Sequence, residues 1–416
     1  MNQKKLNRII QDLLKLEYKN SQVLHLTAYE NQLSEVANYF VGSKLSERYY
    51  FGGGKNNIVD MNPFNCLGLP AVEEIVLEAE KALKEMLGGS VVVLNCLSGV
   101  HSMMCTILSV SNPGDCIMTV HHDDGGHFAT PGILERTGRK NVFAKYDLKN
   151  LEFDAKSTAK IFKKNNCKVL YLDVSYYINA INITDLRREL GEQAIIVFDA
   201  SHTIGLLMGG QLQSPFNEGA DIICANTHKT LPGPQKGLIV FKEKTLGERA
   251  KAIISGSLYS SSHTHHLIAL AITILEMKKF GKAYASQIIK NSNMLGKTLT
   301  DLGYQVRKNN AGRYSDTHQV HLFIDKNKRE EIYMNLVRNN ISTNFDNRMG
   351  GKLFVRLGTQ EVTRRGMKEK EMIRIALILD KAIQGKDVKS NITSLNNRFT
   401  KIEYGFDVRY PKNAEK

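Results

Sequence analysis

The chain has 416 residues, of which 42% are hydrophobic and 24% charged, and its formal net charge is +14. This length is enough for one large and one smaller domain. No apolar run reaches the ~18 residues that a membrane helix needs. The segment 1–15 is polar and lacks the apolar block of a signal peptide. The lysines are spread over the whole chain, so the charge indicates a basic solvated surface, or a field that attracts an anionic cofactor and substrate, rather than a nucleic-acid partner. We therefore expect a cytoplasmic protein with no membrane and no nucleic-acid partner.

The first elements in chain order are predicted to be helical. Residues 1–50 are assigned to an N-terminal helical arm, and residues 60–69, with Pro63 and Gly68, indicate a loop. Pro70–Leu87 is predicted to be a helix because its apolar residues recur at helical spacing, and two glycines follow its end.

Strands and helices then alternate through the middle of the chain. Unbroken apolar runs predict strands at 91–94, 116–120, 142–144, 169–174, 194–198, 222–225 and 238–241, and helical stretches such as 157–164 and 184–192 lie between them. This alternation is typical of an α/β fold with a mostly parallel sheet that is covered on both faces. Residues 51–284 are therefore assigned to one large domain, with its ligands expected beyond the carboxyl ends of the strands.

The pattern changes near residue 285. Helices are predicted at 285–302, 328–338 and 368–383, and strands near 320–324 and 353–357. This order is typical of a smaller α+β domain, which we place at residues 285–416, with a polar and charged tail beyond Gly385.

The cysteines and a histidine cluster give little support for a metal. Six cysteines, at 66, 96, 105, 116, 167 and 224, form no Cys-x-x-Cys pair. We interpret them as reduced core residues, because a metal or redox role is poorly supported by this spacing. The histidines at 263, 265 and 266 lack nearby acidic or cysteine companions, so no metal is expected there either.

Two polar residues at predicted strand ends carry the strongest chemical signal. Asp199 ends a buried apolar strand, and Lys229 follows the next strand in the segment Thr-His-Lys-Thr-Leu-Pro-Gly-Pro. Alone, such an aspartate could cap a helix and such a lysine could be solvated. Together they match the needs of pyridoxal 5'-phosphate (PLP), which condenses with a desolvated lysine amine and needs a carboxylate on its pyridine nitrogen.

Two further motifs agree with this cofactor but are weak alone. Ser98, Gly99 and Val100 follow a strand and open a helix, a turn that offers backbone N–H groups to a phosphate, although a plain N-capped helix has the same pattern. His127 follows two glycines and could stack on a flat ring, or it could lie in a surface turn.

These segments resemble the serine (glycine) hydroxymethyltransferase family of fold type I PLP enzymes over roughly residues 20 to 385. The Thr-His-Lys-Thr segment resembles the family's lysine motif, and the segment after Asp199 resembles its Asp-x-Ala-His motif. An Arg-Tyr-Tyr run before three glycines resembles a segment whose second tyrosine, Tyr50 here, reaches the neighbouring subunit. Arg356 stands where the family binds the substrate carboxylate.

The resemblance implies a set of site residues and a homodimer with shared active sites. The implied catalytic residues are Lys229, Asp199, His127, His202 and Tyr50. The implied cofactor contacts are Ser98, Gly99, Val100, His127, Ser175, Asp199, His202, Asn226, His228, Lys229, Ser261 and Ser262. The implied substrate contacts are Tyr29, Tyr50 and Arg356.

Other positions depart from the family pattern. A substrate-contacting serine reads Tyr29, and the arginine after Gly-Pro reads Gln235. Leucines that pack on folate are replaced by His122 and Phe128. The family's catalytic glutamate cannot be placed before Arg48, unless a shifted alignment lets Glu47 or Glu30 serve instead.

Because the PLP residues are retained and the folate residues are altered, the sequence favours folate-independent aldol chemistry. We expect cleavage or transfer on a threonine- or serine-like β-hydroxy amino acid, through a glycine carbanion, with an aldehyde as the second partner. The alternatives are a serine or α-methylserine hydroxymethyltransferase that uses tetrahydrofolate, and an inactive PLP-fold protein that acts as a binding partner. The intact Lys229, Asp199 and Arg356 argue against the last alternative.

Overall fold

A seven-stranded sheet forms the centre of the larger part of the molecule. The computed structural model describes residues 2–61, 63, 65–176 and 178–408. The strand order is β4 (Val91–Val93), β12 (Gly237–Phe241), β11 (Ile222–Asn226), β10 (Ile195–Asp199), β9 (Cys167–Leu172), β5 (Cys116–Thr119) and β6 (Lys140–Phe143). All seven apolar runs identified in the sequence become these strands, so this prediction is confirmed.

The sheet is mainly parallel, as predicted, with one reversed strand. The four pairs from β11 through β10, β9 and β5 to β6 are parallel, and β12 is antiparallel to both β11 and β4. The segment between β11 and β12 therefore turns back at the carboxyl end of β11. Lys229 lies in this turn, at the edge of the sheet where α/β proteins bind ligands.

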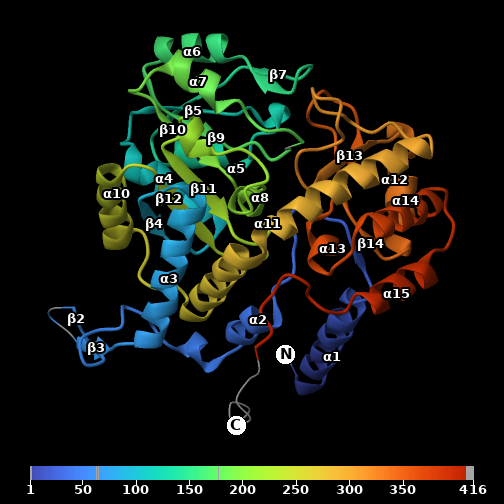
Figure 1. Cartoon of the computed structure of the whole chain (residues 1–416), viewed down its shortest axis with the longest axis horizontal. Helices are drawn as coiled ribbons and strands as arrows, with labels where there is room; N and C mark the ends of the chain where they lie inside the picture. Colours follow the sequence, from blue (N-terminus) through green and yellow to red (C-terminus); the bar gives the residue numbers. More distant parts are fainter. Residues whose placement is uncertain (1, 62, 64, 177, 409–416) are drawn as a thin grey trace.

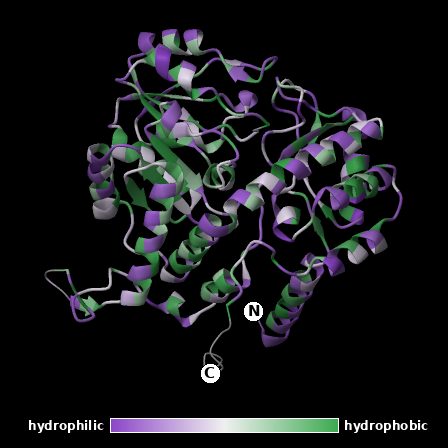
Figure 2. Ribbon diagram, in the orientation of Figure 1, coloured by the Kyte–Doolittle hydropathy of each residue, from purple (hydrophilic) through white to green (hydrophobic). Residues whose placement is uncertain are grey.

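Both faces of this sheet are buried, because alternate residues of each strand point to opposite sides. In β10, Ile196 and Phe198 join the core formed with α3 (Pro70–Leu87) and α11 (Thr264–Asp301). Val197 faces the other core, with α4 (Gly99–Val110) and α10 (Lys244–Ser257). Figure 2 shows the strands of this sheet in mostly hydrophobic colours beneath helices of mixed colour.

Shorter elements complete the large part. The remaining helices are α5 (Ala129–Arg136), α6 (Ala155–Lys164), α7 (Ile183–Leu190), α8 (Ile204–Met208) and α9 (Pro215–Glu218), with short 3-10 turns η1 (Lys44–Glu47) and η2 (His122–Asp124). Two hairpins are β2 (Ile58–Asp60) with β3 (Asn65–Leu67) and β7 (Tyr146–Asp147) with β8 (Glu152–Phe153). The strand β3 lies within residues 60–69, which were predicted to be a loop.

The smaller part is built on a three-stranded antiparallel sheet in the order β13 (Gln319–Phe323), β16 (Phe354–Gly358) and β15 (Asn344–Asp346). Its helices are α12 (Arg329–Arg338), α13 (Gln360–Arg364), α14 (Glu369–Ile383) and α15 (Lys389–Arg398), with the turn η3 (Lys326–Lys328). The predicted helix–strand order of this region is confirmed, and α15 forms in the tail that the sequence analysis left without an element.

The helix predicted at 285–302 is much longer in the structure. It is the second half of α11, which has 38 residues, begins at Thr264 and runs from the large sheet to the smaller part (Figure 1). The start at 285 was wrong because every residue from Leu267 to Ile274 is buried. A helix that is buried all round has no amphipathic period to detect.

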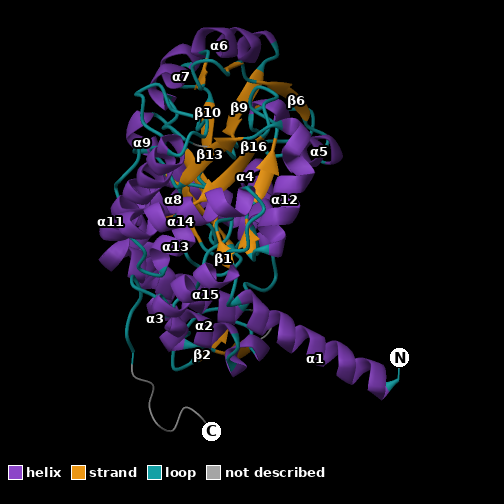
Figure 3. Ribbon diagram, turned by 90° about the vertical axis from the view of Figure 1, so that its right-hand side faces the viewer, coloured by secondary structure: helices purple, strands orange, loops and turns teal. Residues whose placement is uncertain are grey.

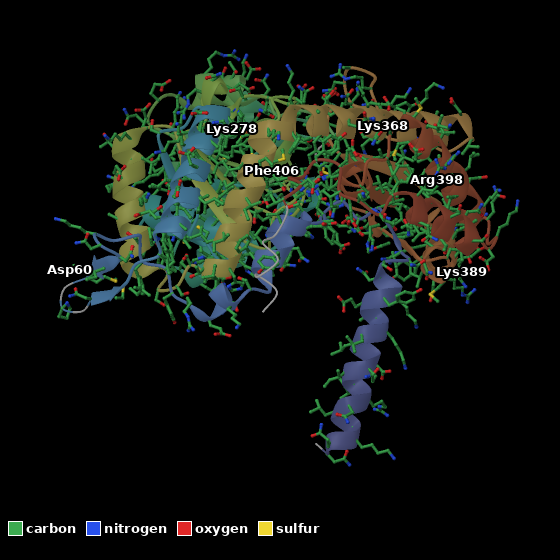
Figure 4. All side chains as sticks on the ribbon, turned by 60° about the horizontal axis from the view of Figure 1, so that its bottom comes forward. Asp60, Lys278, Lys368, Lys389, Arg398 and Phe406 are labelled. Atoms are coloured by element: carbon green, nitrogen blue, oxygen red, sulfur yellow. The ribbon has the colours of Figure 1, made fainter. Side chains whose placement is uncertain are left out.

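The N-terminal region contains the predicted helices but also pairs with the C-terminal part. Helices α1 (Gln3–Asn20) and α2 (Glu35–Val41) are separated by β1 (Leu24–His25), which pairs in parallel with β14 (Ile341–Ser342). Helix α1 has no buried residue and projects from the body of the molecule (Figures 3 and 4). Among the described residues, no helix is long and apolar enough to span a membrane.

Candidate active site

A pocket of about 430 Å³ opens at the carboxyl ends of the strands, between the two parts of the chain. It brings together twelve of the predicted site residues: Tyr29, Ser98, Gly99, Val100, His127, Ser175, Asp199, His202, Asn226, His228, Lys229 and Arg356. They come from segments as far apart as residues 29 and 356, so the sequence motifs converge on one site.

Burial makes the Lys229 amine far easier to deprotonate than an exposed lysine. Desolvation, reinforced by the charge of Arg356 and opposed by Asp199, lowers the pKa of Lys229 to about 7. Its Nζ lies 3.0 Å from Nε2 of His202. The amide nitrogen of Gln319 faces Nδ1 of His202 at 3.5 Å, which assigns the imidazole proton to Nε2, where it points to the lysine lone pair. A neutral amine of this kind can attack an aldehyde.

Asp199 is buried at the end of β10 and held by donors. Its Oδ2 accepts a hydrogen bond from the Tyr171 hydroxyl at 3.0 Å, and its Oδ1 accepts from the backbone N–H of Ser201 at 2.9 Å. These two donors fix the orientation of the carboxylate in the pocket. A charged carboxylate here is what a protonated pyridine nitrogen needs as a partner.

His127 reaches the pocket because glycine precedes it. A Cβ on Gly126 would lie 2.1 Å from the Val120 carbonyl oxygen, so no other residue fits this turn. Nδ1 of His127 accepts from the Ala129 N–H at 3.3 Å, and burial lowers the pKa of the imidazole, although Asp199 partly opposes the shift. A neutral imidazole plane is thus presented to the pocket.

The residues present fit the phosphate and ring of PLP. Ser98 caps α4 through its side chain, so the turn from Ser98 to Val100 presents a helix N-terminus to the pocket. A Cβ on Gly99 would approach Asn226 to 2.7 Å, so only glycine allows this close packing. Among the described residues, Asn226 Oδ1 and His228 Nδ1 are buried without a hydrogen-bond partner, which leaves polar atoms for a ligand.

Arg356 is a buried cation without a carboxylate partner in the described part of the chain. Its Nε donates to Asn344 Oδ1 at 3.0 Å and its Nη1 to the Ser175 carbonyl at 3.2 Å. The guanidinium lies over the rings of Tyr29 and Tyr176, at 5.5 and 4.7 Å from their centroids. Desolvation lowers its pKa to about 10, so it stays charged and is suited to bind a substrate carboxylate.

Three predicted site residues do not line this pocket. Tyr50 is half-buried near α3, where burial and two glutamates raise its pKa to about 12. Ser261 and Ser262 precede α11, and the Ser262 carbonyl accepts a hydrogen bond from the buried Lys236 at 2.8 Å. These are the residues that the family resemblance assigns to the neighbouring subunit's site, so their role stays a prediction.

Sequence reasoning missed several pocket residues. Asp173, Tyr176 and Arg348 line the pocket as well, together with Met103, Val174 and Ser201. Phe128, which the sequence placed at a folate position, also lines it. Asp173 directly follows β9, much as Asp199 ends β10, so an acidic residue after an apolar run was a usable signal. Arg348 binds Asp346 at 2.6 Å and lies 4.6 Å from the Tyr176 ring, an arrangement that only the tertiary fold creates.

A buried lysine and a buried aspartate meet a histidine and a helix N-terminus in one pocket at the carboxyl edge of a mainly parallel sheet, as in a PLP-dependent enzyme of fold type I. The serine hydroxymethyltransferase family model matches residues 3–379. The chain therefore belongs to the serine hydroxymethyltransferase family, and its cofactor is PLP.

Named relatives of the chain fall into two groups. It is 32% identical over 402 residues to a serine hydroxymethyltransferase of Methanocella arvoryzae, covering 92% of each chain. It is also 32% identical over 401 residues to a fluorothreonine transaldolase of Streptantibioticus cattleyicolor, covering 94% of this chain but 62% of that protein. The crystal structure of L-threonine transaldolase from Pseudomonas fluorescens in the internal aldimine state matches with a TM-score of 0.88 at 27% identity, covering 97% of this chain and 94% of that one.

Replacing Arg356 with lysine should weaken amino acid binding while PLP still attaches. A lysine ammonium keeps the charge but not the planar fork that pairs with a carboxylate. We expect KM for the amino acid to rise about ten- to a hundredfold, with the visible absorbance of the bound cofactor unchanged. Arg365→Lys is a matched control, because Arg365 is buried and bonded to Asn396 and Phe399 outside the pocket. An unchanged KM in Arg356→Ala would place the carboxylate site elsewhere.

Proposed function

We propose that this enzyme catalyses aldol-type cleavage and transfer on a β-hydroxy amino acid, with an aldehyde as the second substrate and without tetrahydrofolate. The observation that carries the proposal is the pocket, which is lined by the residues that the resemblance assigns to PLP, while the positions that it assigns to folate differ from the family pattern. When bound, PLP supplies an electron sink for the negative charge that develops at the α-carbon of the amino acid.

The side chains of the pocket suit this reaction. Arg356 would hold the carboxylate of the amino acid, and Asp199 would keep the pyridine nitrogen protonated. The Lys229 amine, held by His202, would condense with the cofactor aldehyde and leave when the amino acid amine takes its place. Burial lowers the pKa of His127, so its imidazole is neutral at pH 7 and can stack on the pyridine ring without placing a second positive charge beside the protonated ring nitrogen.

The altered folate positions support independence from tetrahydrofolate. Among the described residues that line the pocket, the carboxylates are Asp173 and Asp199, with no glutamate. Glu47 lies in η1 and pairs with Arg48 at 3.7 Å, and Glu30 lies 3.9 Å from His25. Glu30 does not line the pocket. Glu47 lies outside the pocket of its own chain, as Tyr50 does, so the folate titration described below decides whether it serves a neighbouring subunit's site.

The wall where a pterin would pack is polar or exposed. His122 lies 3.2 Å from Nη1 of Arg348, so it is part of a charged network rather than an apolar surface. Phe128 lines the pocket but is 74% exposed. A pterin gains affinity from apolar contact, and a histidine in that contact needs a polar partner of its own.

The second candidate is a serine hydroxymethyltransferase that uses tetrahydrofolate. It is favoured by the archaeal relatives of that name, which are as similar to the chain as the transaldolase is. For either activity we propose a homodimer with shared sites, because Tyr50, Ser261 and Ser262 lie outside the pocket of their own chain.

Calorimetric titration with a reduced folate, in the presence of glycine, separates the two candidates. We expect no folate binding, together with acetaldehyde release from threonine that is independent of folate. Lys229→Ala serves as the inactive control for aldehyde release. Tight folate binding, with serine cleavage that depends on it, would instead identify an ordinary hydroxymethyltransferase.

A further inference from the structure

A cluster of two thiols and an imidazole lies directly behind the phosphate-binding turn. Cys96 follows β4, and His101 and Cys105 lie one helical turn apart on α4. One ligand-capable atom from each of the three residues lies within 4.8 Å of the others. The Cys105 Sγ is 3.5 Å from Nε2 of His101. None of the three lines the cofactor pocket, and nothing in the proposed reaction uses them.

The hydrogen bonds of His101 favour a dithiol over a metal site. Its Nδ1 accepts from the Leu97 backbone N–H at 2.9 Å, so the ring proton lies on Nε2, which donates to the Leu258 carbonyl at 3.0 Å. A metal bound beside Cys105 would need Nε2 as its ligand and would move the proton to Nδ1. The Nδ1–H group and the Leu97 N–H would then face each other as two donors, and the hydrogen bond between Leu97 and His101 would be lost.

The surroundings of the two sulfurs favour one thiolate. A hydrogen bond from Cys96, together with the His101 side chain, lowers the pKa of Cys105. The same contact with Cys105 raises the pKa of Cys96, so the shared proton belongs to Cys96. The buried ammonium of Lys236 adds positive charge near Cys96. Electropositive surroundings of this kind are typical of reactive cysteines.

We propose that Cys96 and Cys105 form a redox-active dithiol that a peroxide oxidises to an intramolecular disulfide, and that this disulfide weakens PLP binding. Both sulfurs are buried, so a small oxidant is required. The Cys105 thiolate attacks one oxygen of hydrogen peroxide, and the O–O bond breaks. Hydroxide is the leaving group, and Cys105 becomes a sulfenic acid. The Cys96 sulfur then attacks the Cys105 sulfur, hydroxide leaves, and the Cys96 proton is lost. The net change converts two thiols and one peroxide into one disulfide and two waters.

The coupling to the cofactor runs through the short segment that joins Cys96 to the phosphate turn. The Leu97 N–H is fixed on His101, and the Ser98 hydroxyl accepts from the His101 N–H at 3.1 Å. The Cys96 carbonyl accepts from the Gly237 N–H at 3.2 Å. A disulfide demands a narrow separation and orientation of its two cysteines. Closing it would shift Cys96 and, through these bonds, the N–H groups that Ser98 and Gly99 present to the phosphate.

Peptide mapping after peroxide treatment tests the disulfide. The protein should carry Cys116→Ser, because Cys116 and Cys167 are a second thiol pair with sulfurs 2.9 Å apart. We expect one Cys96–Cys105 linked peptide that dithiothreitol releases, absent in Cys105→Ser and unaffected by Cys66→Ser. Oxidation of Cys105 to a sulfinic acid without a link would overturn the proposal. Stoichiometric zinc binding that needs His101 and protects both thiols would do so as well.

The affinity for PLP, compared between the oxidised and the reduced protein, tests the coupling between the Cys96–Cys105 disulfide and the cofactor site. We expect the oxidised protein to bind PLP about tenfold more weakly than the reduced protein, with recovery after dithiothreitol. Because linkage is reciprocal, saturating PLP should disfavour the disulfide in a thiol–disulfide buffer by the same factor. In Cys105→Ser the affinity should not respond to peroxide. Equal affinities of the two redox states would refute the coupling.

Discussion

Replacing Lys229 with alanine is expected to abolish the visible absorbance of the bound cofactor and nearly all turnover. Burial lowers the pKa of Lys229 to about 7, so much of the amine is neutral near pH 7, and its Nζ lies 3.0 Å from Nε2 of His202, which positions it to condense with an aldehyde. Removing such a covalent residue costs on the order of 10⁴-fold or more in rate. Absorbance spectra and steady-state rates of threonine cleavage measure both effects.

Lys236 provides a matched control for this prediction. It lies in the same turn between β11 and β12, it is fully buried, and desolvation lowers its pKa to about 8. Its amine, however, donates to the Ser262 carbonyl and does not line the pocket. Lys236→Ala should therefore keep the visible absorbance. If borohydride reduction traps the cofactor on Lys236 or any other lysine, the assignment of Lys229 is wrong.

The strands of the large sheet could be predicted because the signal for each strand lies within a few consecutive residues. The inner strands are almost continuous apolar runs, since both faces of the sheet are covered there, and the runs are separated by helices with their own period. The same uniform burial hid the first half of α11, where no polar face marks the helix. The pairing of β1 with β14 joins residues more than three hundred positions apart, and no local pattern encodes it.

The pocket was predictable where a motif coincides with a strand end. Asp199, Lys229 and the Ser98 turn each follow an apolar run, so their positions at the carboxyl edge follow from topology alone. Arg348 belongs to the smaller part and reaches the pocket only because that part packs against the large sheet. A contact of this kind depends on how the two parts of the chain meet, which a single sequence does not reveal.

Replacing Asp199 with asparagine should lower the rate by on the order of 10²-fold or more, the scale of losing one preorganised electrostatic partner. The substitution keeps the shape of the side chain but removes its charge, so the pyridine nitrogen would lose its proton more easily and accept electrons less well. We expect PLP to remain bound, because the phosphate turn and Lys229 are untouched. The measurements are kcat for threonine cleavage and the pH dependence of the cofactor spectrum.

Asp173 gives the comparison that isolates the role of charge. It lies in the same pocket and is buried, but its Oδ2 accepts from the Thr130 hydroxyl at 2.5 Å, and desolvation raises its pKa to about 7. At neutral pH this carboxyl is therefore protonated in about half of the molecules. Since asparagine resembles the protonated form, Asp173→Asn should cost less than about tenfold. Near-wild-type kinetics in Asp199→Asn, or a larger loss in Asp173→Asn, would move the pyridine-binding role from Asp199 to Asp173.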